Sequence, residues 1–488
     1  MTVESVVYAV SGYVASSTVL YTLGHPKRLW TLNALGKNRK VFLKGRIPQM
    51  IAHSVQLVNF GLHAALPQVP FSMFATRSQS ARTLYERSVQ EAFDPKAHHL
   101  ITTGSPHGRA FYPRNFAWFY PTLLDEASVV GVSDLTSRIT LMENSLRLYL
   151  KALHADMCVT TLIPITGKHI VGVNYFAQPS DTLLGVLAGL QQLIGASSDT
   201  EQYQAVMTDA RDRGVRLLSE HKQILKEQLQ ELAASLEHVT VGGQEYLVCD
   251  WSRSRSSATD TRMDRGRFVT NANVWSTFSL AKRLGLLEEA EIEALLGRPL
   301  TAYKSELLAL FGAQGYIVDS LISRYAKAAP EYQVTLDFAH THDGFWDLSS
   351  SEEQALFKAT ADVILNSLAF RSTTGALSIM SVNRPRLKLL HRIFTRAYQS
   401  NVIWASFNVE FASRLLAFSR EAGAPEYEKS AQAILKEVHS MVEQNGQYYE
   451  VCRPDGVRYR TWAYKSAIAD SWFPRFASVW YEAFDESL

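Results

Sequence analysis

Residues 201–237 read EQYQAVMTDARDRGVRLLSEHKQILKEQLQELAASLE, a run in which apolar side chains recur every three or four positions with charged ones between them. This spacing predicts one amphipathic helix or a pair of them. The same spacing returns along the chain, and several runs stop at a glycine, as at Gly285, Gly312 and Gly423. The further runs are residues 135–153, 274–284, 288–296, 304–311, 352–368, 401–420 and 425–443. The sequence therefore predicts an all-α protein.

Strand-like stretches are short and far apart, at residues 160–165, 169–173, 246–249 and 448–452. They do not alternate with helices as the strands of a parallel sheet do, and no glycine-rich phosphate loop follows them. An all-α chain of this length packs its helices as an open solenoid or as a closed ring of helix hairpins. In a ring, the loops between helices converge at one end, and short strands with aromatic-rich loops suit that end.

Composition indicates a cytoplasmic protein with a sizeable core. Of 488 residues, 47% are hydrophobic and 20% are charged, and the net charge of +2 favours neither nucleic acid nor an anionic membrane as partner. The three cysteines, Cys158, Cys249 and Cys452, have neither metal-ligand spacing nor a disulfide framework. Residues 5–25 are interrupted by polar side chains, which predicts a buried or half-buried first helix rather than a signal peptide or a membrane span.

Two carboxylates have aromatic neighbours. Glu450 ends the segment GQYYE and precedes a Pro-Asp-Gly turn at 454–456, which predicts a strand end or loop rim. Asp250 ends the segment YLVCD and precedes Trp251. Hydrolysis of a glycosidic bond needs such a pair, because one carboxyl protonates the leaving oxygen and the other activates water. Aromatic rings beside them would stack on the apolar faces of a sugar.

The most polar stretch of the chain is residues 252–267. It predicts either a domain linker or an active-site loop at 252–270, and we favour the loop because the flanking helices have the same character. Its arginines would ordinarily form a solvated face. If they turn inward, they favour a substrate with a carboxylate or a phosphate. These arginines are Arg253, Arg255, Arg262, Arg265 and Arg267.

Several segments, in order, resemble the six-hairpin (α/α)6-barrel glycosidases. That group includes the glucosidase module of debranching enzymes, processing α-glucosidase, glycosylglycerate hydrolases, trehalases and neutral invertases. The similar segments are YPRNFAW at 112–118, CDW at 249–251 with RMDRG at 262–266 and NANVW at 271–275, YQSNVIW at 398–404 with Asn408, and YEVCRPDG at 449–456 with Ser471-Trp472. The resemblance extends from about residue 107 to residue 481.

The resemblance implies an (α/α)6 toroid, a six-hairpin barrel with short β-hairpins and loops at its active-site end. Residues 1–488 would form one catalytic domain, in which residues 1–100 are helical. It implies inverting hydrolysis of a small α-linked glucoside or mannoside, with Asp250 as general acid and Glu450 as general base. No cofactor or metal is implied, and a homo-oligomer is left open. The expected substrate-binding residues are Tyr112, Arg114, Asn115, Trp118, Asp181, Trp251, Arg262, Asn271, Trp346, Trp404, Asn408 and Trp472.

The assignment of the acid leaves four residues open. Asp250 precedes a long loop, so the equivalent position can slip to Asp260 or Asp264. Asp181 precedes an apolar helix, where capping is the ordinary role, but relatives place a functional carboxylate in this region. Asn115 stands where the family has Asp, which removes a charge that would hold a sugar hydroxyl. Arg114 is expected to bind a sugar or a substrate carboxylate, or else to pair with residue 125 or 126.

Two other functions stay open. A sugar epimerase on a similar helical barrel would move a proton at carbon and would depend on His340, His342 or His391. The pair His340 and His342 lacks a third metal ligand at convincing spacing, so we expect a loop at the barrel mouth, with Trp346 lining a subsite. A helical-repeat scaffold without catalysis would form an extended superhelix with a concave surface.

Overall fold

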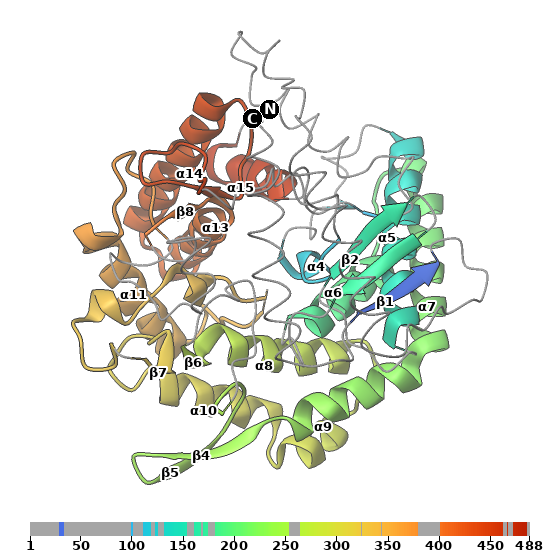
Figure 1. Ribbon diagram of the computed structural model, residues 1–488, viewed down its shortest axis with the longest axis horizontal. Helices are drawn as coiled ribbons and strands as arrows, with labels where there is room; N and C mark the ends of the chain where they lie inside the picture. Colours follow the sequence, from blue (N-terminus) through green and yellow to red (C-terminus); the bar gives the residue numbers. More distant parts are fainter. Residues whose placement is uncertain are drawn as a thin grey trace, which may run out of the picture.

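The structure is a computed structural model of the 488-residue chain. It describes residues 29–33, 99–100, 111–118, 123–124, 131–153, 161–166, 169–173, 181–252, 264–323, 325–342, 344–378, 401–461, 466 and 472–485. Most of the elements are helices, and they follow one another around a ring (Figure 1). The predicted first helix at 5–25 lies outside the described residues. None of the described helices is both long and apolar enough to cross a bilayer.

Three helices form the inner side of the ring and are buried around almost their whole circumference. They are α6 (Thr182–Ile194), α8 (Phe268–Arg283) and α13 (Ala405–Ala422). A helix that is buried on all sides needs small or apolar residues all round, and a polar residue in it must bond internally. This explains why the start of α8, residues 268–273, lies outside the amphipathic run predicted at 274–284.

Each inner helix packs against an outer helix that buries only one face. The outer helices are α7 (Glu201–Ala234), α10 (Leu300–Phe311) and α14 (Pro425–Asn445), which pack on α6, α8 and α13 respectively. The all-α prediction is therefore confirmed, and residues 201–234 form one helix rather than two. The hairpin pairs α6–α7, α8–α10 and α13–α14 lie within the described residues, while the count of six pairs stays a prediction.

Further helices complete the described part of the ring (Figure 1). α5 (Val132–Leu153) packs on α6 and α7, and α15 (Phe473–Phe484) packs on α13 and α14. The others are α4 (Asn115–Trp118), α9 (Glu289–Leu296), α11 (Ser351–Asn366) and the 3₁₀ turns η3 (Pro330–Tyr332), η4 (Leu336–Ala339) and η5 (Leu368–Phe370).

Glycine allows α4 to lie directly against α6. A Cβ at Gly185 would stand 2.1 Å from the backbone oxygen of Pro113 and 2.5 Å from Cα of Arg114. One turn later, a Cβ at Gly189 would stand 3.0 Å from the ring of Phe116. Any side chain at Gly185 would push the turn before α4 away from the start of α6. The two glycines therefore fix the position of Arg114 relative to α6.

Short strands connect the helices. β1 (Leu29–Asn33), β3 (His169–Val173) and β2 (Thr161–Thr166) form an antiparallel sheet in that order. The expectation that residues 1–100 are helical is therefore wrong for residues 29–33. Their sequence, LWTLN, contains Trp and Thr, which suit a pleated surface. The remaining antiparallel pairs are β4 (Glu237–Val241) with β5 (Gln244–Val248), β6 (Arg265–Arg267) with β7 (Ser320–Ile322) and β8 (Ile403–Trp404) with β9 (Val451–Cys452).

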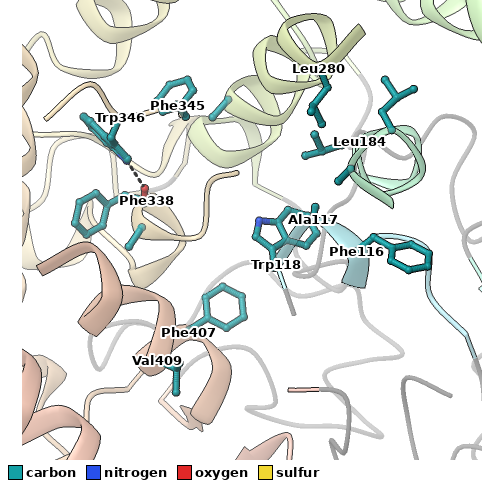
Figure 2. Close-up of a cluster of buried hydrophobic side chains, with 14 of the residues drawn as sticks. Phe116, Ala117, Trp118, Leu184, Leu280, Phe338, Phe345, Trp346, Phe407 and Val409 are labelled. Carbon is teal, nitrogen blue, oxygen red and sulfur yellow. Dashed lines mark hydrogen bonds between the residues drawn. The ribbon is translucent and has the colours of Figure 1, made fainter. Parts of the chain in front are cut away.

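A row of rings in contact runs through the interior from α4 to the residue that precedes α15. We call it the central aromatic row. Its rings are Trp118, His340, Phe407, Trp404 and Trp472, with centroids 4.4–6.1 Å apart from one ring to the next. Figure 2 shows Trp118 of α4 pointing inward, between Phe407 of α13 and the side chains Leu184 and Leu280 of α6 and α8.

Candidate active site

Asp250 lies directly after β5, where the chain turns toward the start of α8. Its backbone has a φ of 61°, in the left-handed region that residues with a Cβ rarely adopt. Its carbonyl oxygen accepts the N–H of Gly266 at 3.2 Å, and its carboxylate Oδ1 accepts the N–H of Arg267 at 3.1 Å. Strained backbone is retained where the surroundings fix it, which often marks a functional position.

The Asp250 carboxyl is fully buried. Its Oδ2 lies 3.6 Å from Nε of Arg267, whose side chain is 1% exposed. Burial raises the pKa of Asp250 to about 7, and the Arg267 guanidinium opposes this rise. A carboxyl with this pKa still carries a proton near neutral pH, which an exposed aspartate does not.

Asn271 fixes the peptide that precedes Asp250. Its Oδ1 accepts the N–H of Cys249 at 2.7 Å, and its Nδ2 donates to the carbonyl oxygens of Arg267 at 2.8 Å and Cys249 at 3.4 Å. Both the oxygen and the nitrogen of the Asn271 amide are thus hydrogen-bonded within the protein, and the residue has no exposed surface. The structure places Asn271 behind the candidate acid as a support for its backbone rather than at a substrate contact.

Asn408 repeats this arrangement in α13. Its Oδ1 accepts the N–H of Leu377 at 3.0 Å, and its Nδ2 donates to the carbonyl oxygens of Leu377 at 2.9 Å and Trp404 at 3.0 Å. Each asparagine lies four residues after the residue that precedes its helix, Arg267 or Trp404. We call this arrangement the asparagine latch. It joins the first turn of an inner helix to an extended segment from earlier in the chain, which is again a structural use.

Glu450 lies at the start of the short ladder between β8 and β9. The following residue, Val451, pairs with Trp404, so Glu450 is held beside the start of α13. Its exposure is 9%, compared with 0% for Asp250. The predicted strand end is confirmed, because β9 begins one residue later. The neighbouring Tyr449 ring is covered by the Arg458 guanidinium, whose carbon lies 4.5 Å from the ring centroid.

Asp181 and Arg114 form an ion pair at the start of α6. Nη1 of Arg114 lies 3.7 Å from Oδ2 of Asp181, and the guanidinium also lies 4.9 Å from the centroid of the Tyr112 ring. Asp181 is fully buried, and its side chain makes no capping hydrogen bond to α6. Asp181 therefore occupies the N-cap position expected for it, but without the side-chain hydrogen bond of a cap. The alternative partners of Arg114 at 125 and 126 lie outside the described residues.

The structure describes some of the remaining candidate site residues, both for the acid and for substrate binding, and leaves others outside the described residues. Asp264 is buried, with 3% exposure, immediately before β6. Asp260 lies outside the described residues, as does Arg262. Asn115 is buried in the first turn of α4. Trp251 is half-buried, and its Cε3 would touch a Cβ at Gly266, so the indole covers the outer side of β6.

The other predicted tryptophans lie in the core. Trp346 is 7% exposed, and its indole N–H donates to the carbonyl oxygen of Phe338 at 3.2 Å (Figure 2). Four phenylalanine rings have centroids within 6.2 Å of its own. The structure thus places Trp346 in the core, and its expected role in lining a subsite stays a prediction. Trp118, Trp404 and Trp472 belong to the central aromatic row and are at most 7% exposed. Their burial gives them a packing role.

His340 lies between the rings of Trp118 and Phe407. The ring centroids are 4.6 Å and 4.4 Å away respectively. Burial, assisted by the positive charges of Arg114 and Arg414, lowers the pKa of His340 to about 3. The imidazole is therefore neutral near neutral pH. Among the residues that the structure describes, no three His, Cys, Asp or Glu side chains gather as metal ligands would.

The polar stretch after Asp250 is shorter than predicted, and one of its arginines faces inward. β6 occupies 265–267 and α8 begins at Phe268, so the expected loop at 252–270 is wrong from residue 265 onward. Arg267 is buried rather than solvated, because its backbone pairs with β7 and its guanidinium faces Asp250. Arg265 donates to the carbonyl oxygen of Ser252 at 2.7 Å. Arg253 and Arg255 lie outside the described residues.

The sequence grouped Arg267 with the loop arginines and did not predict its position beside Asp250. Its only local signal is the segment RGRF, in which a glycine stands between two arginines just before an apolar run. That pattern is compatible with a strand entering a buried helix, but the polarity of the preceding stretch hid it. Three carboxylates consequently lie at the starts of inner helices: Asp181 at α6, Asp250 at α8 and Glu450 at α13.

Comparison with known proteins gives a likeness of fold. No family model matches the sequence, and no curated protein matches it. A solved glycosidase is 10% identical, with 83% of this chain and 96% of that one covered and a TM-score of 0.49. A rhamnosidase from Klebsiella oxytoca with rhamnose bound is 11% identical, with 81% and 63% covered and a TM-score of 0.45.

A GH63 mannosylglycerate hydrolase from Thermus thermophilus in complex with glucose is also similar. It is 11% identical, with 82% of this chain and 99% of that chain covered and a TM-score of 0.44. These identities and TM-scores do not establish which side chains are equivalent. The roles of Asp250, Glu450 and their neighbours therefore rest on contacts within this chain.

Proposed function

We propose that this protein is a glycoside hydrolase in which Asp250 protonates the leaving oxygen. The observation that carries the proposal is the buried carboxyl of Asp250, held in left-handed backbone, whose pKa is raised to about 7. A general acid must hold its proton at the working pH and release it in the transition state, which is easiest when its pKa lies near that pH.

Glu450 is the proposed general base. It is the less buried of the two carboxylates and lies beside the start of α13, as Asp250 lies beside the start of α8. Because an outer helix follows each inner helix and packs back along it, successive inner helices start at the same end of a ring of hairpins. This topology supports a common end of the ring for Asp250, Glu450 and the Arg114–Asp181 pair.

The proposed reaction is inverting and requires no cofactor. Water attacks the anomeric carbon on the face opposite the leaving group and gives a proton to Glu450, while the carbon–oxygen bond breaks and Asp250 gives its proton to the leaving oxygen. A separation of about 6.5–9.5 Å between the two carboxyl groups leaves room for that water. The proposed substrate is a small α-linked glucoside or mannoside, a class supported by the sequence resemblance.

The test is activity on p-nitrophenyl glycosides, disaccharides and glycosylglycerates. Asp250→Asn and Glu450→Gln should each reduce kcat/KM by at least about a hundredfold, because each removes a proton-transfer group. Matched controls are Asp209→Asn and Glu443→Gln, whose exposed side chains form ion pairs on outer helices. Near-full activity in folded Asp250→Asn and Glu450→Gln would refute the assignment. Proton NMR of the first-formed anomer distinguishes inversion from retention.

The two rival functions have less support. An epimerase that moves a proton through His340 needs an imidazole that titrates near neutral pH, whereas the pKa of His340 is lowered to about 3. His391 lies outside the described residues. A scaffold of stacked repeats would extend in a line, whereas the described helices follow a ring (Figure 1).

A further inference from the structure

We propose that Arg267 is a positioning residue that holds the Asp250 carboxyl from both of its oxygens and controls how readily that carboxyl releases its proton. This inference rests on the proposed function of Asp250. Two contacts come from the same residue: the Arg267 backbone N–H to Oδ1 at 3.1 Å, and its Nε facing Oδ2 at 3.6 Å. The exposed fractions of the two side chains are 0% for Asp250 and 1% for Arg267.

Arg267 is itself fixed by the elements around it. Its backbone pairs with Ser320 of β7, and its carbonyl oxygen accepts the Nδ2 proton of Asn271. Its Nη2 donates to the hydroxyl of Thr270 at 3.2 Å. Because backbone and side chain are both held, the guanidinium cannot swing away from Asp250 without breaking buried hydrogen bonds. This rigidity distinguishes it from an arginine on a surface loop.

The charges near Asp250 give Arg267 an electrostatic role. Arg267 is the charged side chain, among the residues that the structure describes, that acts on the Asp250 carboxyl. Buried titratable groups on or beside the neighbouring elements include Cys249 after β5, Asp264 before β6, Asp319 before β7 and Tyr303 of α10. Burial favours the neutral carboxyl, and the guanidinium favours the ionised one. The two effects oppose each other at a single site.

Arg267 is placed to stabilise the negative charge that forms on Asp250 when its proton is transferred. When Asp250 gives its proton to the leaving oxygen, a negative charge forms on a fully buried carboxyl. That charge forms next to a guanidinium that is already in position, so no reorganisation of the site is needed. Without Arg267 the carboxyl would hold its proton to higher pH and would donate it less readily. Arg267 thus acts through Asp250 and needs no contact with substrate.

The first test uses the full-length protein and no substrate. The Asp250 carboxyl is titrated by 13C NMR, with Asp250→Asn to assign its resonance, in wild type, Arg267→Gln and Arg267→Lys. Arg267→Gln removes the charge and keeps a polar side chain, whereas Arg267→Lys keeps the charge. We expect the midpoint to rise by at least about one pH unit in Arg267→Gln, a tenfold change in proton affinity, and to return toward wild type in Arg267→Lys. Equal midpoints in the two variants would overturn the proposal.

A second measurement needs no variant of Arg267, so it stays decisive if Arg267→Gln does not fold. In wild type, the 15Nε resonance of Arg267 should shift with the same midpoint as the Asp250 carboxyl, and Asp250→Asn should abolish the shift. A resonance that does not change with pH would contradict the pairing. With an active glycoside in hand, the alkaline limb of the kcat/KM profile should move with the carboxyl midpoint. If no glycoside is cleaved, the proposed function fails while both titrations still test Arg267.

Discussion

Replacing Asp250 by asparagine should change the pH dependence of stability as well as the activity. The carboxyl has a pKa of about 7 in the folded protein, compared with an ordinary value of 3.8. The folded state therefore binds this proton more tightly than the unfolded state does. By proton linkage, the free energy of unfolding falls as pH rises from about 4 to about 7, and it is flat outside that window. Asparagine has the same shape and no proton to lose.

The size of the effect follows from the gap between the two pKa values. About three units at 1.36 kcal/mol each correspond to about 4 kcal/mol lost by wild type across the window. Asp250→Asn should therefore gain about 4 kcal/mol relative to wild type between pH 4 and pH 8. Any constant cost of the substitution, such as a less favourable contact with Arg267, cancels in this comparison.

Urea unfolding followed by tryptophan fluorescence at pH 4, 6 and 8, at constant ionic strength, measures this difference. The control is Asp209→Asn, whose carboxylate is half exposed on α7 and should give a curve parallel to wild type. Parallel pH dependences for wild type and Asp250→Asn would refute the reasoning. They would mean that the carboxyl ionises in the folded protein as it does in water, and the case for Asp250 as a general acid would fail with it.

Two further predictions concern the frame that carries the site. Gly185→Ala should lower the free energy of unfolding, measured in urea, by about 1–3 kcal/mol or more, because its Cβ would overlap the backbone at Pro113. The control Gly131→Ala should stay within about 0.5 kcal/mol of wild type, because a Cβ there meets no atom within 4 Å. Asn408→Leu should cost about 2–5 kcal/mol, because it leaves the N–H and carbonyl groups of Leu377 buried and unpaired; an unchanged urea midpoint would show that the latch contributes no stability.

The outer helices could be predicted from the sequence because each has one apolar, buried face and one charged, exposed face. In α7 and α14, buried residues recur every three or four positions and exposed charged ones lie between them. That alternation is visible without knowing what the helix packs against. The predicted helix ends were also close, for the inner helix α13 as for the outer helix α14, since Gly423 and Gly446 adopt left-handed backbone immediately after them.

The starts of the inner helices could not be predicted in the same way. The first turn of α8 contains Thr270 and Asn271, which look exposed in the sequence but are buried in hydrogen bonds to neighbouring backbone and side chains. Polarity indicates exposure only when the partner is water, and here the partner comes from an earlier part of the chain. Arg267 was misplaced for the same reason. Trp346 was expected to line a subsite, and only packing from other elements shows that it lies in the core among phenylalanine rings.

The asparagine latch fixes the backbone beside an inner helix without fixing which side chain follows it. The residue after the held peptide is Asp250 at α8 and Ser378 at α13. Because the asparagine amide hydrogen-bonds only to main-chain atoms, these bonds do not constrain which side chain the residue after the held peptide carries. The same backbone arrangement thus presents a carboxyl group at α8 and a hydroxyl group at α13. A ring built from such units can acquire or lose a reactive group by a single substitution, with its helices left where they are.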